Sequence, residues 1–199
     1  MSISAALKAF LDQQGVPYTP HKHAVVYTAQ ELAAAQHVPG KQFAKCVAIK
    51  TNTGLCLAVL PAIHLVDFPK LKQLLNATSV KLASEADIKQ AFPDAEVGAM
   101  PPFGNLYRVP TVVDQSLAQS TEIVCNAGSH SDTITLRYQD YARLVNPKVG
   151  AFGLHVAGKK PAKDKTKSKK TAKRAPAKRQ KVAARKPAAR AKRTRKRKS

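Results

Sequence analysis

The chain has 199 residues and a formal net charge of +22, of which residues 159–199 carry +20 (21 Lys and Arg against one acid) and residues 1–158 only +2. A near-neutral stretch of this length suits one globular domain and excludes two ordinary ones, and no apolar run is long enough to span a membrane. We therefore expect one domain over residues 1–158 and a separate basic extension over residues 159–199.

The first half of the domain predicts helices interspersed with strands. The apolar spacing of residues 4–14 is typical of an amphipathic helix, which Gly15 ends. An extended piece follows over residues 16–21, and a capping box from Thr28 to Glu31 begins a second helix that runs to about residue 36. Two strongly apolar strands, residues 44–50 and 55–60, are joined by a hairpin turn that contains Gly54.

The second half predicts two capped helices, three strands and a closing helix. Asp67 caps a helix through residue 75, and Ser84 with Asp87 caps another that ends near residue 92. Strands are expected over residues 111–113, 122–126 and 133–138, and a short helix over residues 139–144. This order predicts an α/β (α+β) domain with a mixed, largely antiparallel sheet and surrounding helices.

The basic extension repeats Lys, Arg, Ala and Pro, with no aromatic residue and with Val182 as its one branched aliphatic residue. Such a segment cannot bury enough apolar surface to offset its chain entropy, so we expect disorder. A solubility tail, a targeting signal and an anionic-membrane anchor are alternatives, but flexible positive charge without an apolar face favours nucleic acid. The densest cluster, expected to bind nucleic acid, comprises Lys192, Arg193, Arg195, Lys196, Arg197 and Lys198.

Several common chemistries have no motif in the sequence. There is no phosphate-binding loop, dinucleotide fingerprint or nucleophile elbow, and the three cysteines match no zinc spacing. The odd number of cysteines and the absence of a leader pattern indicate a reducing compartment. We expect a cytoplasmic protein that needs no metal, no cofactor and no membrane.

Two local features point to chemistry. Lys45 interrupts an apolar run at the beginning of a strand that we expect to be well buried. A lysine there is costly unless it reaches solvent at the sheet edge or meets an anion, and the periodicity leaves both interpretations open. The second feature is the loop from Gly98 to Gly104, in which glycines permit close approach of a ligand and prolines restrict the backbone. A rigid connector would have the same composition.

In series, these features resemble the YbaK/ProX family of aminoacyl-tRNA deacylases, which includes the editing domain of bacterial prolyl-tRNA synthetases. The resemblance covers about residues 1–150. Its matching segments are residues 43–47, the GxxxP loop 98–102 with Phe103 and Gly104, the turn 126–132, and residues 140–141. The extension lies outside it and is similar to the Lys-Ala-Pro-rich tails of histone H1.

The resemblance implies an enzyme that hydrolyses, in trans, the ester of tRNA mischarged with a small amino acid. Mischarged tRNA is the implied partner, and an aminoacyl-tRNA synthetase is a further candidate. Lys45 would contact the substrate, and the backbone N–H groups of Gly98, Ala99 and Met100 would stabilise the developing oxyanion. The residues implied to surround the substrate are Pro102, Phe103, Gly128, Ser129, His130 and Asp132.

The proposed reaction uses water and no covalent intermediate. Ser129, His130 and Asp132 lie close in sequence, but neighbouring residues of an extended segment point to opposite sides, which argues against a catalytic triad. His130 is expected to bind substrate or order water, and Asp132 to orient His130. Two other classes remain open: a non-enzymatic nucleoid or chromatin-like nucleic-acid-binding protein, and a module that docks on a tRNA synthetase.

Overall fold

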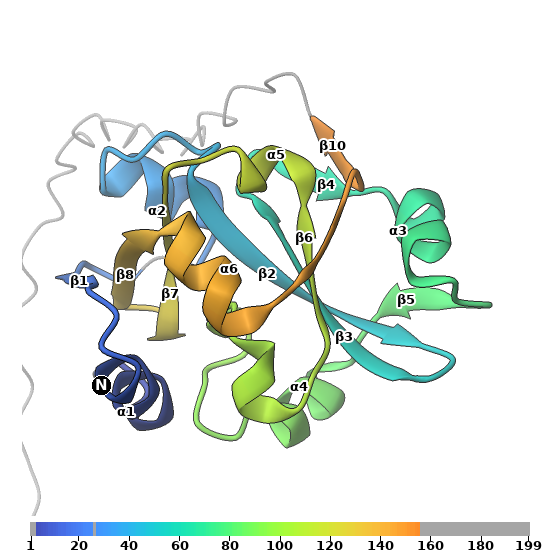
Figure 1. Ribbon diagram of the computed structural model, residues 1–199, viewed down its shortest axis with the longest axis horizontal. Coiled ribbons are helices and arrows are strands. Elements are labelled where there is room, and N and C mark those ends of the chain that lie inside the picture. Colours follow the sequence, from blue (N-terminus) through green and yellow to red (C-terminus); the bar gives the residue numbers. More distant parts are fainter. Residues whose placement is uncertain (1–2, 26, 156–199) are drawn as a thin grey trace, which may run out of the picture. The chain divides into compact units, whose positions relative to one another are not determined.

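The computed structural model describes residues 3–25 and 27–155 (Figure 1). The basic extension, its cationic cluster and the expected domain boundary at residue 158 lie outside the described residues. In the part of the chain that is described, no helix is long and apolar enough to cross a membrane.

An eight-stranded mixed sheet forms the centre of the domain (Figure 1). Its main path runs β1-β8-β7-β2-β3-β6-β9, and β5 pairs with β2. The ladders β1–β8, β2–β3, β2–β5 and β7–β8 are antiparallel, whereas β2–β7, β3–β6 and β6–β9 are parallel, which confirms the predicted sheet type. The strands are β1 (Thr19–Lys22), β2 (Phe43–Thr51), β3 (Gly54–Pro61), β5 (Val80–Leu82), β6 (Thr111–Asp114), β7 (Glu122–Ser129), β8 (Asp132–Arg137) and β9 (Lys148–Gly150).

A smaller two-stranded sheet joins β4 (His64–Val66) to β10 (Gly153–His155). The two strands are antiparallel, with His64 opposite His155. This pairing holds the last described residues of the chain against the segment that follows the β2–β3 hairpin. The sequence did not predict either strand.

The helices begin close to where the capping residues predicted. The Thr28 side chain accepts a hydrogen bond from the Glu31 N–H, and Ser84 with Asp87 forms a complete capping box. Tyr138, expected at the end of a strand, instead begins the last helix. The helices are α1 (Ala5–Gln13), α2 (Ala29–Ala35), α3 (Phe68–Leu75), α4 (Glu85–Ala91), α5 (Gln115–Ala118) and α6 (Tyr138–Val145), with a 3-10 turn over Gly104–Tyr107.

The side chains of β2 alternate between two cores on opposite faces of the sheet. Ala44 and Ala48 pack into the larger core, together with side chains of α1 and of α6, which lies across the near face of the sheet in Figure 1. Phe43 and Ile49 pack on the other face, which α2 and α3 cover. Because Lys45 lies two residues after Phe43, its side chain is on the face with α2.

Candidate functional site

The Lys45 side chain is half-buried and has no acidic partner. Its Nζ donates a hydrogen bond to the carbonyl oxygen of Ala62 over 3.2 Å, and Gln30 Nε2 donates to the same oxygen over 3.4 Å. Within the described ranges, no carboxylate lies within 4.0 Å of this ammonium. Burial lowers the pKa of Lys45 below its ordinary value. The ammonium is therefore available to an anionic or carbonyl group of a ligand.

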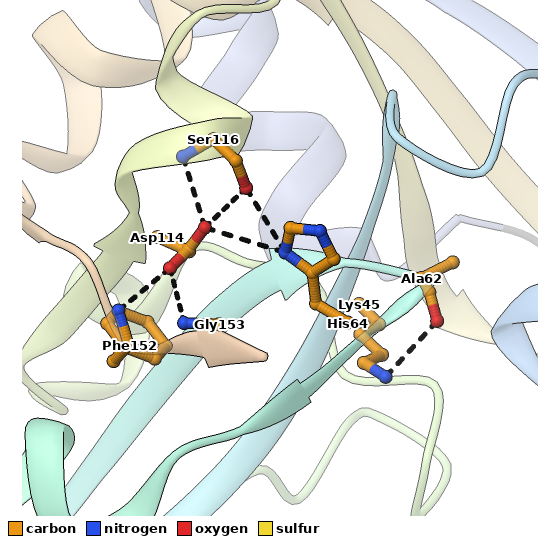
Figure 2. Close-up of polar contacts among 7 residues, drawn as sticks. All are labelled: Lys45, Ala62, His64, Asp114, Ser116, Phe152 and Gly153. Carbon is orange, nitrogen blue, oxygen red and sulfur yellow. Dashed lines mark hydrogen bonds and ion pairs between the residues drawn. The ribbon is translucent and has the colours of Figure 1, made fainter. Parts of the chain in front are cut away.

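A second polar cluster lies beside Lys45, as Figure 2 shows. Ser116 Oγ lies 3.2 Å from His64 Nδ1, and Asp114 Oδ1 lies 3.7 Å from the same nitrogen. Asp114 Oδ2 also accepts hydrogen bonds from the Phe152 and Gly153 N–H groups, over 2.9 and 2.6 Å. The carboxylate thus ties the end of β6 to the beginning of β10.

The surroundings of His64 disfavour its protonation. Burial lowers the pKa of His64, and the positive charge of Lys45 acts in the same direction against the opposing effect of Asp114. The sequence around His64 indicates no role for it, because its partners lie some fifty residues away. No local signal identifies such a cluster.

The glycine–proline loop supplies fewer free donors than the sequence implied. The Ala99 N–H donates to the Glu96 carbonyl over 2.9 Å, and the Gly98 N–H lies 3.3 Å from Met100 Sδ. Over residues 3–25 and 27–155, no acceptor is recorded for the Met100 N–H. The loop is held to the fold by the Tyr141 hydroxyl, which donates to the Pro102 carbonyl, and by the Gly128 N–H, which donates to the Ala99 carbonyl.

His130 packs directly against this loop. Its Nε2 lies 3.1 Å from the Val97 carbonyl, and its N–H donates to Glu96 Oε2 over 2.9 Å. Gly98 has φ +92, and a Cβ there would lie 3.4 Å from the His130 ring, so glycine suits both the backbone and the contact. The ring also faces Tyr27, with centroids 5.0 Å apart, and the two residues share a pocket of about 280 Å³.

Asp132 does not orient His130, contrary to the sequence-based expectation. Asp132 is buried, and its Oδ2 accepts hydrogen bonds from the hydroxyls of Ser129 and Ser131, each over 2.7 Å. These bonds close the β7–β8 turn, where Ser129 pairs with Asp132 just after the register shift between Asn126 and Ser129. In the structure Glu96, rather than Asp132, contacts the His130 backbone.

Lys45 and the buried side chains of the loop lie on opposite faces of the central sheet. The side chains of Met100 and Phe103 pack in the core that contains Ala44, on the face of the sheet opposite to Lys45. Gln30 of α2 shares the Ala62 carbonyl with Lys45, while Tyr27, just before α2, contacts His130. The contacts thus bring His130 together with the loop, and place Lys45 with His64.

The parallel ladder between β2 and β7 ends beside Lys45. It pairs Phe43 with Val124 and Ala44 with Cys125, and β2 then continues without β7. The Gly128–Ala99 hydrogen bond joins the loop to β7 just beyond this point. A ligand that reaches both Lys45 and the loop backbone would therefore lie where the two strands part.

The cysteines are unsuited to nucleophilic catalysis. Burial raises the pKa of the Cys46 thiol, which follows Lys45 in the sequence. It also raises the pKa of Cys56, to about 11, so both thiols are protonated at neutral pH. Among the residues that the structure describes, no group of three or more His, Cys, Asp or Glu is arranged to hold a metal ion.

These features define a small α/β domain with a partly desolvated lysine on β2 and a glycine–proline loop hydrogen-bonded to β7. A family model described as the aminoacyl-tRNA editing domain matches residues 23–144, and the chain belongs to this family. The predicted YbaK/ProX assignment is confirmed. Editing of aminoacyl-tRNA is hydrolysis of its ester bond, so the chain is an aminoacyl-tRNA deacylase, a hydrolase.

Named relatives and a solved structure agree with the family. The prolyl-tRNA editing protein ProX of Acetoanaerobium sticklandii is 26% identical over 158 residues, covering 76% of this chain and 96% of the relative. The multifunctional Ser/Thr-tRNA deacylase ProXp-y of Escherichia coli K12 is 27% identical over 151 residues, covering 73% and 90%. The solved structure of a putative trans-editing enzyme for prolyl tRNA synthetase matches with a TM-score of 0.67 at 18% identity, covering 76% of this chain and 96% of that chain, and supports the fold.

Proposed function

We propose that this deacylase acts in trans, in the cytoplasm, on tRNA mischarged with a small amino acid such as Ala, Ser, Thr or Cys. The relatives named for Ser/Thr-tRNA deacylation and prolyl-tRNA editing support a substrate of this kind. The observation that carries the proposal is the half-buried Lys45 ammonium, which lacks a carboxylate partner in the described part of the chain.

In the proposed complex, Lys45 contacts the terminal ribose and ester of the tRNA. An ammonium in a partly desolvated position stabilises developing negative charge more strongly than one in bulk water. Its single recorded acceptor, the Ala62 carbonyl, leaves two of its three N–H groups for the substrate. The lowered pKa of His64 disfavours a second positive charge beside this ammonium.

The Met100 N–H is the proposed backbone donor to the ester oxygen. It has no recorded acceptor within the described ranges, whereas the Ala99 and Gly98 N–H groups already have intramolecular acceptors and would have to exchange them. Pro102 and Phe103 hold the loop in place, since the Pro102 carbonyl is bonded to Tyr141 and Phe103 is fully buried.

The pocket between His130 and Tyr27 is proposed to receive the aminoacyl end. A volume of about 280 Å³ is at the lower limit for small-molecule pockets, which favours small side chains. Exclusion of larger side chains by size is easier than discrimination of one methylene group. Gly128 and Ser129 shape the turn next to this pocket, and Asp132 fixes that turn.

Water is the proposed nucleophile. The Ser129 hydroxyl donates to Asp132 and is not activated by His130, whose ring nitrogen faces the Val97 carbonyl. An aminoacyl ester is already activated, so positioning and charge stabilisation are sufficient without a covalent intermediate.

The basic extension is proposed to bind the body of the tRNA. Its 21 Lys and Arg, including the cluster from Lys192 to Lys198, supply charge that the near-neutral domain lacks. Such a segment binds phosphates through counterion release with little sequence preference.

The test compares two lysines of β2. A panel of tRNAs mischarged with Ala, Ser, Thr or Cys is incubated with the wild type, Lys45→Ala and Lys50→Ala, and loss of the ester is followed. Lys50 is the matched control, because it lies on the same strand but is ion-paired with Asp87 at 2.7 Å.

We expect Lys45→Ala to slow deacylation at least 100-fold, the usual effect of removing a transition-state donor, and Lys50→Ala to change it less than twofold. Equal rates for the two variants would show that Lys45 is not part of the site. No hydrolysis of any tRNA in the panel by the wild type would contradict the proposed substrate class.

A further inference from the structure

Asn126 of β7 carries a polar atom that the fold does not satisfy. Its side-chain Oδ1 is buried and has no hydrogen-bond partner among the described residues. A buried acceptor without a donor costs free energy, so such an atom in a native structure needs an explanation. The neighbouring Thr133, directly opposite on β8, has a fully paired hydroxyl that bonds with Gln36.

The register of the sheet places Asn126 beside Lys45. In the parallel β2–β7 ladder, Phe43 pairs with Val124 in one core and Ala44 pairs with Cys125 in the other. Because side chains alternate, the next residue of each strand, Lys45 and Asn126, returns to the face of Phe43 and Val124. The two polar side chains thus leave the same face at adjacent positions, where the ladder ends.

The ligand atom that satisfies the Asn126 Oδ1 must be a hydrogen-bond donor. The free α-ammonium of an aminoacyl ester is a poor candidate, because the Lys45 ammonium next to it would repel a second positive charge. A hydroxyl avoids this conflict, since it can donate to the Asn126 oxygen and accept from the Lys45 ammonium at once. An aminoacyl-tRNA carries such a group: the terminal ribose hydroxyl that is not esterified, next to the reacting ester.

We propose that Asn126 is a substrate-positioning residue whose carboxamide accepts a hydrogen bond from the free hydroxyl of the terminal ribose, with Lys45 on the other side of that hydroxyl. The inference rests on the proposed function and adds the ribose contact to it. This contact fixes the rotation of the ester relative to the loop.

The experiment removes each partner of the proposed contact in turn. The full-length protein is given the best substrate of the mischarged panel, esterified at the 3′ position and ending in either adenosine or 2′-deoxyadenosine. Single-turnover rates are measured for the wild type, Asn126→Ala, Asn126→Ser and the control Thr133→Val. Thermal unfolding of each protein is measured in parallel.

On the adenosine-terminated substrate, we expect Asn126→Ala to slow hydrolysis about tenfold, as loss of one hydrogen bond does. On the deoxy substrate, Asn126→Ala and the wild type should differ less than twofold, because the hydroxyl is already gone. Thr133→Val should preserve the wild-type ratio of the two substrates. The melting temperature of Asn126→Ala should not fall, since the variant removes an unsatisfied group.

Other outcomes would overturn the inference. If Asn126→Ala and Asn126→Ser slow both substrates by the same factor, Asn126 acts on water or on the fold and not on the ribose. If they slow neither, it has no role in the reaction. An active wild type with unaffected Asn126 variants would leave the proposed deacylation standing, whereas an inactive wild type would remove both proposals.

Discussion

Lys45 holds a charge in a position where burial lowers its pKa. In the folded state its pKa lies below the unfolded value, so at neutral pH the protein carries the charge at a cost in stability. Between the two pKa values the unfolded state binds more protons, and the free energy of unfolding rises with pH. If Lys45 is retained for its charge and not for stability, replacing it with an apolar residue of similar length should remove this cost.

We predict that Lys45→Met, which keeps the length of the side chain, raises the melting temperature at pH 7 while deacylation is lost. The difference from the wild type should shrink as the pH rises through the lowered pKa, because the wild-type lysine then becomes neutral. Thermal unfolding at pH 7 and pH 9.5 checks this. The control Lys50→Met loses the ion pair with Asp87 and should not be stabilised. A Lys45→Met protein less stable than the wild type would mean that the ammonium stabilises the fold.

At the scale of the elements, Asp114 connects parts of the chain that are distant in sequence. Its carboxylate accepts hydrogen bonds from Ser116 in α5 and from the N–H groups of Phe152 and Gly153 at the beginning of β10. Burial acts to raise the pKa of Asp114, but these hydrogen bonds outweigh it and the pKa lies below its ordinary range. The stabilisation is present above the unfolded pKa and is lost as the pH falls through the folded one.

We predict that Asp114→Ala lowers the free energy of unfolding by about 2–4 kcal/mol at pH 7, because it leaves several buried N–H groups without an acceptor. Urea unfolding at pH 7 and pH 3 measures the effect. The difference between the variant and the wild type should be smaller at pH 3 than at pH 7, because the stabilisation begins to be lost as the pH falls below the unfolded pKa toward the lowered folded one. Asp67→Ala, which removes the cap of α3, is the control and should cost only about 1 kcal/mol. A loss for Asp114→Ala no greater than for Asp67→Ala would contradict the argument.

The sequence predicted the elements whose signals are local. Thr28 and Ser84 cap the helices that they were expected to cap, and the apolar run around Lys45 correctly placed it within a strand of the sheet. The predicted strands 111–113 and 122–126 lie within β6 and β7, and β7 extends three residues further through the bulge.

The elements that the sequence missed are short and depend on distant partners. β4 and β10 have three residues each, too few for a periodic pattern, and they exist because each pairs with the other. The cluster of His64 with Asp114 and Ser116 follows from that pairing and from the end of β6, so no stretch of sequence contains it. For the loop from Gly98, family resemblance supplied the roles, while composition alone indicated a rigid connector equally well.

On the scale of the whole molecule, the net positive charge and the described domain lie in different parts of the chain. Residues 1–158 are close to neutral, and the extension from residue 159 carries almost the entire net charge. The last described element, β10, ends at His155 and is paired with β4. A truncation after residue 158 therefore removes the charge and leaves every described strand in place, so binding and chemistry can be tested separately.

We predict that the protein truncated after residue 158 binds tRNA more weakly and with a smaller dependence on salt. If the extension engages on the order of ten phosphates, the full chain has a slope of log K against log salt of roughly −7 to −9, which the truncation should largely abolish. Single-turnover deacylation at saturating tRNA should change little, because Lys45 and the loop remain. A chain with residues 159–199 in scrambled order should bind like the wild type, since counterion release depends on charge and not on order. Equal affinity and salt slope for the truncated and full chains would assign tRNA binding to the domain alone.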